Sequence, residues 1–213
     1  MTMINVPVYD KDGKEVGSLK VDKAMFGTWV RYPLLKQAIV MYHANKRVGT
    51  ATTKSRGMVA GSTRKLYKQK GTGNARVGNL RTGKRVGGGV TFGKIARDFS
   101  RAMPKKQRKL AADSAILAKI LTNNLIVVDE LKFEKPKTRD FADILGNLKI
   151  ERSCLVMTSA LDENLYKSAR NIPRVVIMPV SQLNAGDVCN HQKVLFTKDA
   201  FLVLLNRDKS SEN

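Results

Sequence analysis

Residues 125–158 read LIVVDELKFEKPKTRDFADILGNLKIERSCLVMT and contain two apolar runs separated by a helix-spaced segment. The runs at 125–128 and 154–158 are short and almost continuously apolar, which is typical of strands buried on both faces. Between them, Phe141, Ile144 and Leu145 recur at the spacing of one helix face. A strand, a helix and a strand in this order predict a βαβ unit with parallel strands.

The same alternation continues toward the C-terminus. Leu165 and Ala169 share one face of a further expected helix, and apolar runs at 175–178 and 194–196 predict two more strands. Thr197 follows the last run and is a good N-cap for a final helix. We therefore expect an α/β fold of three layers (α/β/α), in which helices cover both faces of a mainly parallel sheet.

The N-terminal part predicts a β-hairpin. Residues 4–9 and 16–21 are strand-like and flank Asp10-Lys11-Asp12-Gly13, a turn sequence that contains glycine. We expect the hairpin to add a short antiparallel pair of strands to the sheet.

Two further helices are expected on either side of the middle of the chain. Leu35, Ala38 and Tyr42 lie on one face of the first helix, which follows Pro33. Leu117 and Leu121 lie on one face of the second, which follows Pro104.

Positive charge is concentrated between these helices. The chain of 213 residues has 39 Lys and Arg against 18 Asp and Glu, a net charge of +21 and a pI near 10.2. Residues 46–109 hold 19 of the cations and one acid, while the remainder has 20 basic and 17 acidic residues. Such an imbalance indicates a polyanionic partner, above all a nucleic acid.

The same segment has no means of forming a core. It contains 11 of the 16 glycines and three aromatic residues, and residues 49–100 show neither a helical nor a strand period. A loop of that length without secondary structure is unusual in a compact domain. We expect the segment to be either disordered or ordered by an external partner.

Composition excludes several classes of protein. No apolar run approaches the ~20 residues of a membrane span, and residues 1–16 lack the features of a signal peptide. Cys154 and Cys189 are too few for a disulfide framework or a thiolate zinc site. We expect a cytoplasmic protein without cofactor or metal, and with no membrane or small-molecule partner.

Glycine-rich motifs raise the alternative of a nucleotide-binding enzyme. Residues 78–85 nearly match a phosphate-binding loop, but Arg85 replaces the hydroxyl that would hold magnesium and no apolar strand precedes them. Residues 71–76 open like a dinucleotide motif and then place Arg76 where glycine belongs. Glycines that allow close approach to RNA explain both stretches better, although an RNA-directed enzyme and a free regulatory RNA-binding factor stay as alternatives.

Other polar clusters have ordinary explanations. Asp187, Cys189 and His191 lie close together in sequence, but surface or loop roles are favoured over a metal or nucleophile site. Asp129 and Glu130 follow a predicted strand, where a solvated acid or a helix cap is the simpler interpretation. Phe26 is expected in the core, whereas Trp29 beside Arg31 is left open between packing and binding.

Five blocks of sequence resemble one known family. They are, in chain order, GTATTKSR at 49–56, KQKGTGNAR at 68–76, GGGVTFG at 87–93, PKK at 104–106 and DENLYKSARN at 162–171. In this order they resemble the fourth protein of the large ribosomal subunit, over nearly the whole chain. Tyr67 stands where relatives have tryptophan, and Lys94 and Ala96 replace two prolines of the family pattern.

The resemblance implies a single ribosomal protein domain over residues 1–213. Residues 1–48 and 101–213 would form the α/β body, and residues 49–100 an extended loop threaded through ribosomal RNA toward the peptide exit tunnel. The protein would be a monomer within the large subunit in the cytoplasm, with large-subunit RNA and neighbouring ribosomal proteins near the tunnel as partners. It would support assembly and have no catalytic residue.

The resemblance and the cation pattern together predict the RNA-binding residues. Gln69, Lys70, Gly71, Thr72 and Gly73 would form a tip facing the tunnel, with Lys70 close to the tunnel wall near the macrolide site. The complete predicted set is Lys46, Arg47, Lys54, Arg56, Arg64, Lys65, Tyr67, Lys68, Gln69, Lys70, Gly71, Thr72, Gly73, Arg76, Arg81, Lys84, Arg85, Gly87, Gly88, Gly89, Lys94, Arg97, Lys105 and Lys106.

Overall fold

A computed structural model describes residues 3–207, and these divide into two units. The sheet unit comprises the described residues up to 43 and from 102 onward, and the basic unit comprises residues 44–101. The elements are β1 (Met3–Tyr9), β2 (Glu15–Asp22), the 3-10 helix η1 (Lys23–Phe26), α1 (Tyr32–Asn45), α2 (Lys105–Leu121), β3 (Leu125–Val128), α3 (Thr138–Asn147), β4 (Cys154–Thr158), α4 (Glu163–Ala169), β5 (Val175–Pro179), the 3-10 helix η2 (Val180–Gln182), α5 (Ala185–Asn190), β6 (Lys193–Thr197) and α6 (Lys198–Asn206).

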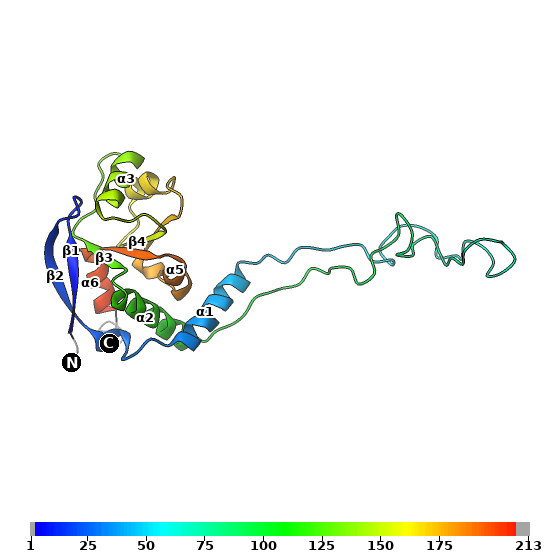
Figure 1. Ribbon diagram of the computed structural model, residues 1–213, viewed down its shortest axis with the longest axis horizontal. Coiled ribbons are helices and arrows are strands. Elements are labelled where there is room, and N and C mark those ends of the chain that lie inside the picture. The colour runs from blue at the N-terminus through cyan, green and yellow to red at the C-terminus, as the bar shows by residue number, and fades with distance from the viewer. Residues whose placement is uncertain (1–2, 208–213) are drawn as a thin grey trace. The chain divides into compact units, whose positions relative to one another are not determined.

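A six-stranded sheet organises the sheet unit (Figure 1). The strand order is β2-β1-β3-β6-β4-β5, and every neighbouring pair is parallel except β1 with β2. The predicted mainly parallel α/β sheet with an N-terminal hairpin is therefore confirmed. None of the helices within residues 3–207 has the length and apolar character that crossing a membrane requires.

The hairpin turn depends on Gly13. Its φ is +77°, in the left-handed region that favours glycine, and its amide donates a hydrogen bond to the Asp10 carbonyl over 3.0 Å. A Cβ atom at this position would lie 2.5 Å from the carbonyl oxygen of Asn147, the last residue of α3. Glycine is thus required both by the turn and by the approach of α3.

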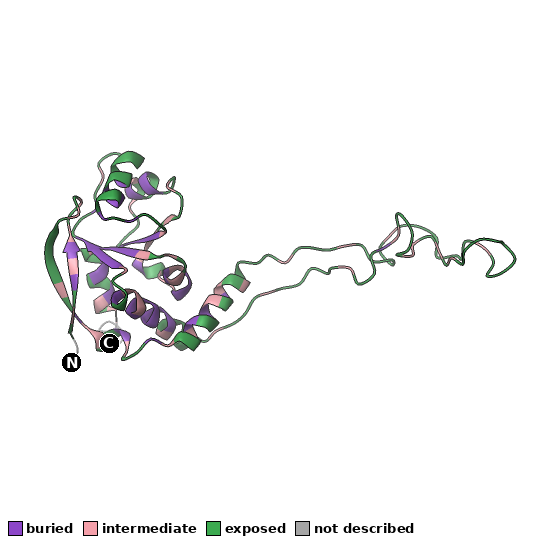
Figure 2. Cartoon of the chain, in the orientation of Figure 1, coloured by how far each residue is buried: buried purple, intermediate pink, exposed green. Residues whose placement is uncertain are grey.

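Alternate residues of each central strand pack on opposite faces of the sheet. Leu125 and Val127 of β3 belong to a core that includes residues of α1, α2, α5 and α6. Ile126 and Val128 belong to a second core that includes residues of α3 and α4. Helices on both faces account for the almost complete burial of the central strands (Figure 2). The three predicted layers are confirmed.

Most predicted helix faces are buried, with two differences. Met41 rather than Tyr42 is the fully buried residue in the last turns of α1. Leu121 is 51% exposed because it is the last residue of α2, beyond the apolar stripe that ends at Ile120. The predicted cap of α6 is confirmed, since the Thr197 hydroxyl accepts a hydrogen bond from the amide of Ala200 over 3.3 Å.

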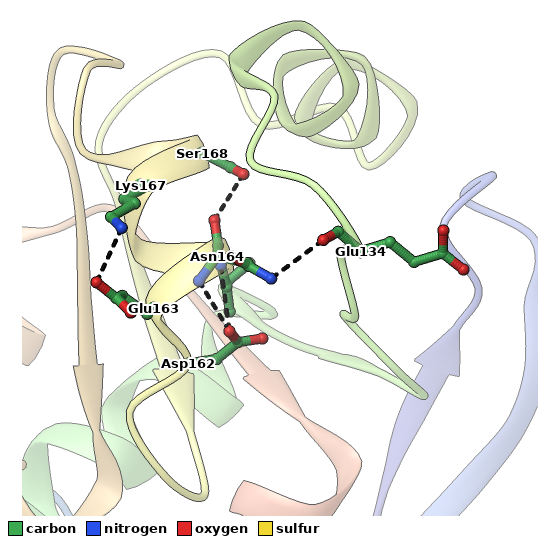
Figure 3. Close-up of polar contacts among 7 residues, drawn as sticks. Glu134, Asp162, Glu163, Asn164, Lys167 and Ser168 are labelled. Carbon is green, nitrogen blue, oxygen red and sulfur yellow. Dashed lines mark hydrogen bonds and ion pairs between the residues drawn. The ribbon is translucent and has the colours of Figure 1, made fainter.

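The block at 162–171, which resembles the family pattern, has a structural role at α4. The Asp162 carboxylate accepts hydrogen bonds from the amides of Asn164 and Leu165 over 2.9 and 3.5 Å, and so caps the helix (Figure 3). The Asn164 side chain donates to the carbonyls of Phe133 and Glu134. These bonds attach α4 to the connection between β3 and α3.

Replacement of Asp162 should destabilise the sheet unit. Asp162→Ala removes the cap acceptor, for which we expect a loss of about 1 kcal/mol and a fall in Tm of about 2–4 °C. Asp162→Asn keeps an acceptor oxygen and serves as the control. Calorimetry of the full chain measures both, and equal melting of the Ala variant and the unaltered protein would contradict the role of the cap.

Candidate nucleic-acid interface

The basic unit contains no helix or strand between the end of α1 and residue 101. Its secondary structure is limited to one isolated antiparallel bridge between Lys65 and Asn79. The unit carries 15 Lys and Arg and one acid, Asp98, and is exposed over almost all of its length (Figure 2). Most of its cationic side chains are therefore available to an external anion.

Hydrogen bonds hold the outgoing and returning lengths of the unit side by side. Near its ends, the Asn45 side chain bonds to both the amide and the carbonyl of Arg101, over 2.8 and 3.3 Å. Further along, three backbone bonds join the two lengths: Arg97 amide to Gly49 carbonyl (3.2 Å), Thr53 amide to Lys94 carbonyl (2.9 Å) and Val90 amide to Lys54 carbonyl (2.9 Å). The unit thus has internal structure that its lack of periodicity did not predict.

The ring of Phe99 contacts two of the predicted cations, Arg47 and Arg97. The guanidinium groups of Arg47 and Arg97 lie 3.9 and 4.5 Å from the centre of its ring. Cation–π attraction offsets part of the repulsion between the two arginines and holds them together. The ring of Phe99 was not among the predicted site residues, although an aromatic residue between arginines is a signal that sequence reasoning can use.

The predicted tip is a turn closed by a few contacts. The amide of Leu66 donates to the Gly78 carbonyl over 3.1 Å, and the Tyr67 hydroxyl donates to the Ala75 carbonyl. Beyond these contacts, Gly71 and Gly73 have φ values of +82° and +69°, and no atom lies within 4 Å of a Cβ built on either. Glycine at the tip therefore serves backbone conformation, not packing.

A tighter arrangement, which we call the node, is formed by residues 53–56 and 81–93. Three backbone hydrogen bonds fold residues 81–89 into a closed loop: Arg85 amide to Thr82 carbonyl (3.1 Å), Gly88 amide to Arg85 carbonyl (3.0 Å) and Gly89 amide to Arg81 carbonyl (3.0 Å). Gly89 is buried, and a Cβ there would overlap the backbone of Arg56. A Cβ at Gly88 would overlap the Thr82 carbonyl. These glycines are required because backbone packs directly on backbone.

The single acid of the unit has a local structural role. The side chain and amide of Ser100 donate hydrogen bonds to the Asp98 carboxylate and lower its pKa. Asp98 stays ionised at neutral pH, yet one carboxylate compensates few of the 15 cations. The unit is strongly positive throughout the physiological pH range.

The structure brings most of the predicted RNA-binding residues into one unit. Of the 24 residues, 22 lie in the basic unit, whereas Lys105 and Lys106 are the first residues of α2 in the sheet unit. The same unit contains two residues outside the predicted set: Phe92, whose side chain is fully exposed, and Arg101, which closes the unit through Asn45.

The structure does not favour the nucleotide or metal sites considered as alternatives at residues 78–85 and 187–191. Residues 78–85 are flanked by neither strand nor helix, so they lack the setting of a phosphate-binding loop. The ring of His191 lies 2.7 Å from the Asp187 carbonyl, and burial raises the pKa of the Cys189 thiol. Within residues 3–207, no three His, Cys, Asp or Glu side chains are grouped so that they could hold a metal ion.

The structure also shows the surroundings of Asp129, Phe26 and Trp29. Asp129 forms an ion pair with Lys198 over 2.9 Å at the surface. Phe26 is in the core, as predicted, and Trp29 is 60% exposed with the Arg31 guanidinium 5.7 Å from its ring centre.

The chain matches the model of a known protein family. The model of the ribosomal protein L4/L1 family matches residues 19–207. The chain belongs to this family. The family is structural and non-enzymatic, so the predictions of family and of a non-enzymatic protein are both confirmed.

Individual relatives are similar over almost their whole length. A protein of Carboxydothermus hydrogenoformans is 45% identical over 94% of this chain and 97% of its own. One of Symbiobacterium thermophilum is 46% identical over 93% and 96%, and one of Rhodopirellula baltica is 44% identical over 93% and 90%. Each is described as large ribosomal subunit protein uL4.

The node should resist trypsin in the free protein unless its glycines are replaced. Gly89→Ala forces a Cβ into the Arg56 backbone, so we expect cleavage at Arg81, Lys84 and Arg85 to become several-fold faster. Gly57→Ala is the matched control, because its Cβ would meet nothing closer than 3.9 Å. Limited proteolysis with mass spectrometry measures each site, and identical rates in the two variants would show that the node is not packed in solution.

Proposed function

We propose that this structural constituent of the large ribosomal subunit binds large-subunit ribosomal RNA through its basic unit and supports assembly of the subunit. The tip at residues 69–73 would line the peptide exit tunnel near the macrolide site. The observation that carries the proposal is the set of 15 exposed or half-exposed cations on a unit that has one acid and no apolar core.

The chemistry of the unit suits folded RNA. Arginine can bridge two phosphate oxygens or stack on a base, and lysine neutralises a phosphate as a point charge. Glycine allows backbone amides to approach phosphate closely. If about eight phosphate contacts form, the logarithm of the binding constant should fall with the logarithm of salt concentration with a slope near ~7. Affinity is therefore expected to depend steeply on salt.

The two units would have different roles, the sheet unit as the folded body and the basic unit as the RNA-binding part. The sheet unit has its own cores on both faces of the sheet, so we expect it to fold without RNA. The basic unit (the RNA-binding loop at 49–100 lies within it) has hydrogen bonds but no core, so contacts with RNA phosphates would stabilise it. Neighbouring large-subunit proteins are the expected protein partners, and the chain would act as a monomer within the ribosome.

Removal of charge from the basic unit should weaken RNA binding selectively. Lys→Gln substitutions at 54, 65, 84 and 94 remove four cations of the basic unit, and we expect the salt slope to fall by up to ~4. The control carries Lys→Gln at 14, 20, 36 and 135, which are exposed on the sheet unit. Filter binding to a large-subunit RNA transcript between low and moderate salt measures both, and equal slopes in the two variants would exclude the basic unit as the interface.

Reversal of charge at Lys70 tests the tunnel assignment separately. Lys70→Glu should assemble into subunits, yet alter chemical probing of tunnel RNA and change macrolide sensitivity, because a carboxylate would face phosphates with little screening. Lys70→Arg keeps the sign and should be mild. Lys84→Glu makes the same charge change in the node, so identical probing patterns and drug sensitivity for the Lys70 and Lys84 variants would refute a special role for the tip.

A further inference from the structure

Residues of the node, together with residues 76–78, line a partly open cavity with a volume of about 700 Å³. Four cations line it, Arg56, Arg76, Lys84 and Arg85, together with several glycines and Phe92. None of the residues that line the cavity is acidic. Four positive charges around one hollow create a potential that favours an anionic occupant.

Phe92 is the unusual member of this lining. Its ring is fully exposed although it is among the largest apolar side chains of the unit, and its φ is +52°. A non-glycine residue in this region is strained, and such residues cluster at functional sites. The protein therefore holds an apolar ring in water on strained backbone, which core packing does not explain.

The backbone on both sides of Phe92 is fixed by its neighbours. The amide of Val90 donates to the Lys54 carbonyl, and the Lys94 carbonyl accepts from the Thr53 amide, each over 2.9 Å. At Gly93, a Cβ would collide with the Thr53 hydroxyl, so this residue also packs closely. These contacts hold the backbone on both sides of Phe92, and with it the positive φ of this residue.

The walls of the cavity are fixed in the same way. Gly89 packs on the backbone of Arg56, and a Cβ at Gly83 would lie 2.7 Å from the Thr91 hydroxyl. The walls are therefore held by hydrogen bonds and backbone packing within the unit itself. A preformed site loses less conformational entropy on binding than a flexible one.

An exposed aromatic ring beside clustered cations matches one chemical class of ligand. Unpaired nucleotides in RNA are bound by stacking of the base on an aromatic side chain and by contact of cations with the adjoining phosphates. The volume lies within the range of about 300–1,000 Å³ that is usual for small-molecule and nucleotide sites. A purely electrostatic groove along an RNA backbone would need neither the ring nor the strain.

We propose that the node binds a single unpaired nucleotide of large-subunit RNA, with its base stacked on Phe92 and its flanking phosphates contacted by Arg56, Arg76, Lys84 and Arg85. This inference rests on the proposed function and adds to it a specific recognition site. The rest of the basic unit would contact phosphates without reading any particular nucleotide.

Ultraviolet crosslinking of the full-length protein to a large-subunit RNA transcript tests the proposal. Mass spectrometry should find one predominant nucleotide attached at Phe92. Phe92→Ala should abolish this crosslink and lower affinity by about 5- to 100-fold at an unchanged salt slope, since stacking carries no charge. Phe92→Tyr should retain both. Ile95→Ala is the matched control, because Ile95 is 81% exposed in the same unit and does not line this cavity.

Two more measurements separate loss of the ring from loss of the fold. Phe92→Gly removes the ring but relieves the positive φ, so it should bind RNA as weakly as Phe92→Ala. The trypsin pattern of the node should be the same in all Phe92 variants and the unaltered protein. Binding by Phe92→Gly at the level of the unaltered protein would overturn the stacking role.

The outcomes distinguish this site from the proposed function. If the unaltered protein binds RNA with a steep salt slope, while Phe92→Ala binds like Ile95→Ala and no crosslink forms at Phe92, the nucleotide site is refuted and RNA binding stands. If the unaltered protein shows no salt-dependent binding, the proposed function fails. Equilibrium dialysis with labelled AMP should show no saturable binding at micromolar concentration, and such binding would instead assign the cavity to a free nucleotide.

Discussion

Repulsion between like charges is the constraint on which the architecture of this chain depends. Residues 44–101 carry 15 cations and one acid, Asp98, whose carboxylate accepts a hydrogen bond from Ser100. Burial of these side chains would require counter-charges that the segment does not possess, because an unpaired buried charge is strongly unfavourable. The segment therefore stays exposed, and the apolar residues of the chain gather in a separate sheet unit. An RNA partner would supply the missing negative charge.

Within that limit, the basic unit still gains structure from groups that carry no charge. Backbone hydrogen bonds join its two lengths, Phe99 holds two arginines on its ring, and glycines allow backbone to pack on backbone in the node. Each interaction is modest, since a net hydrogen bond contributes about 0.5–1.5 kcal/mol. Together they direct the cations outward and shape a cavity, without the hydrophobic core that normally provides such order.

In the sheet unit, the spacing of apolar residues predicts the strands and helices but not every buried position. The strands at 125–128 and 154–158 were predicted at their observed bounds, and the Thr197 cap was predicted with its helix. The predictions were less accurate at Leu121 and Tyr42, because the spacing of apolar residues gives a helix face but not the last residue that the core covers. The node had no periodic signal at all, since its contacts join residues 53–56 to residues 81–93 through the backbone, which every sequence shares.

The class of the fold, the location of the charge and the family could all be predicted from the amino-acid sequence. Apolar runs and helical spacing act locally, and charge adds up without reference to structure, so both can be read along the chain. Three features required the three-dimensional fold: which cations share one cavity, why Gly88 and Gly89 cannot carry a side chain, and that Phe92 presents its ring to solvent. These features arise from contacts between residues distant in sequence, where the hydrogen bond or the excluded volume belongs to the fold and not to any single residue type.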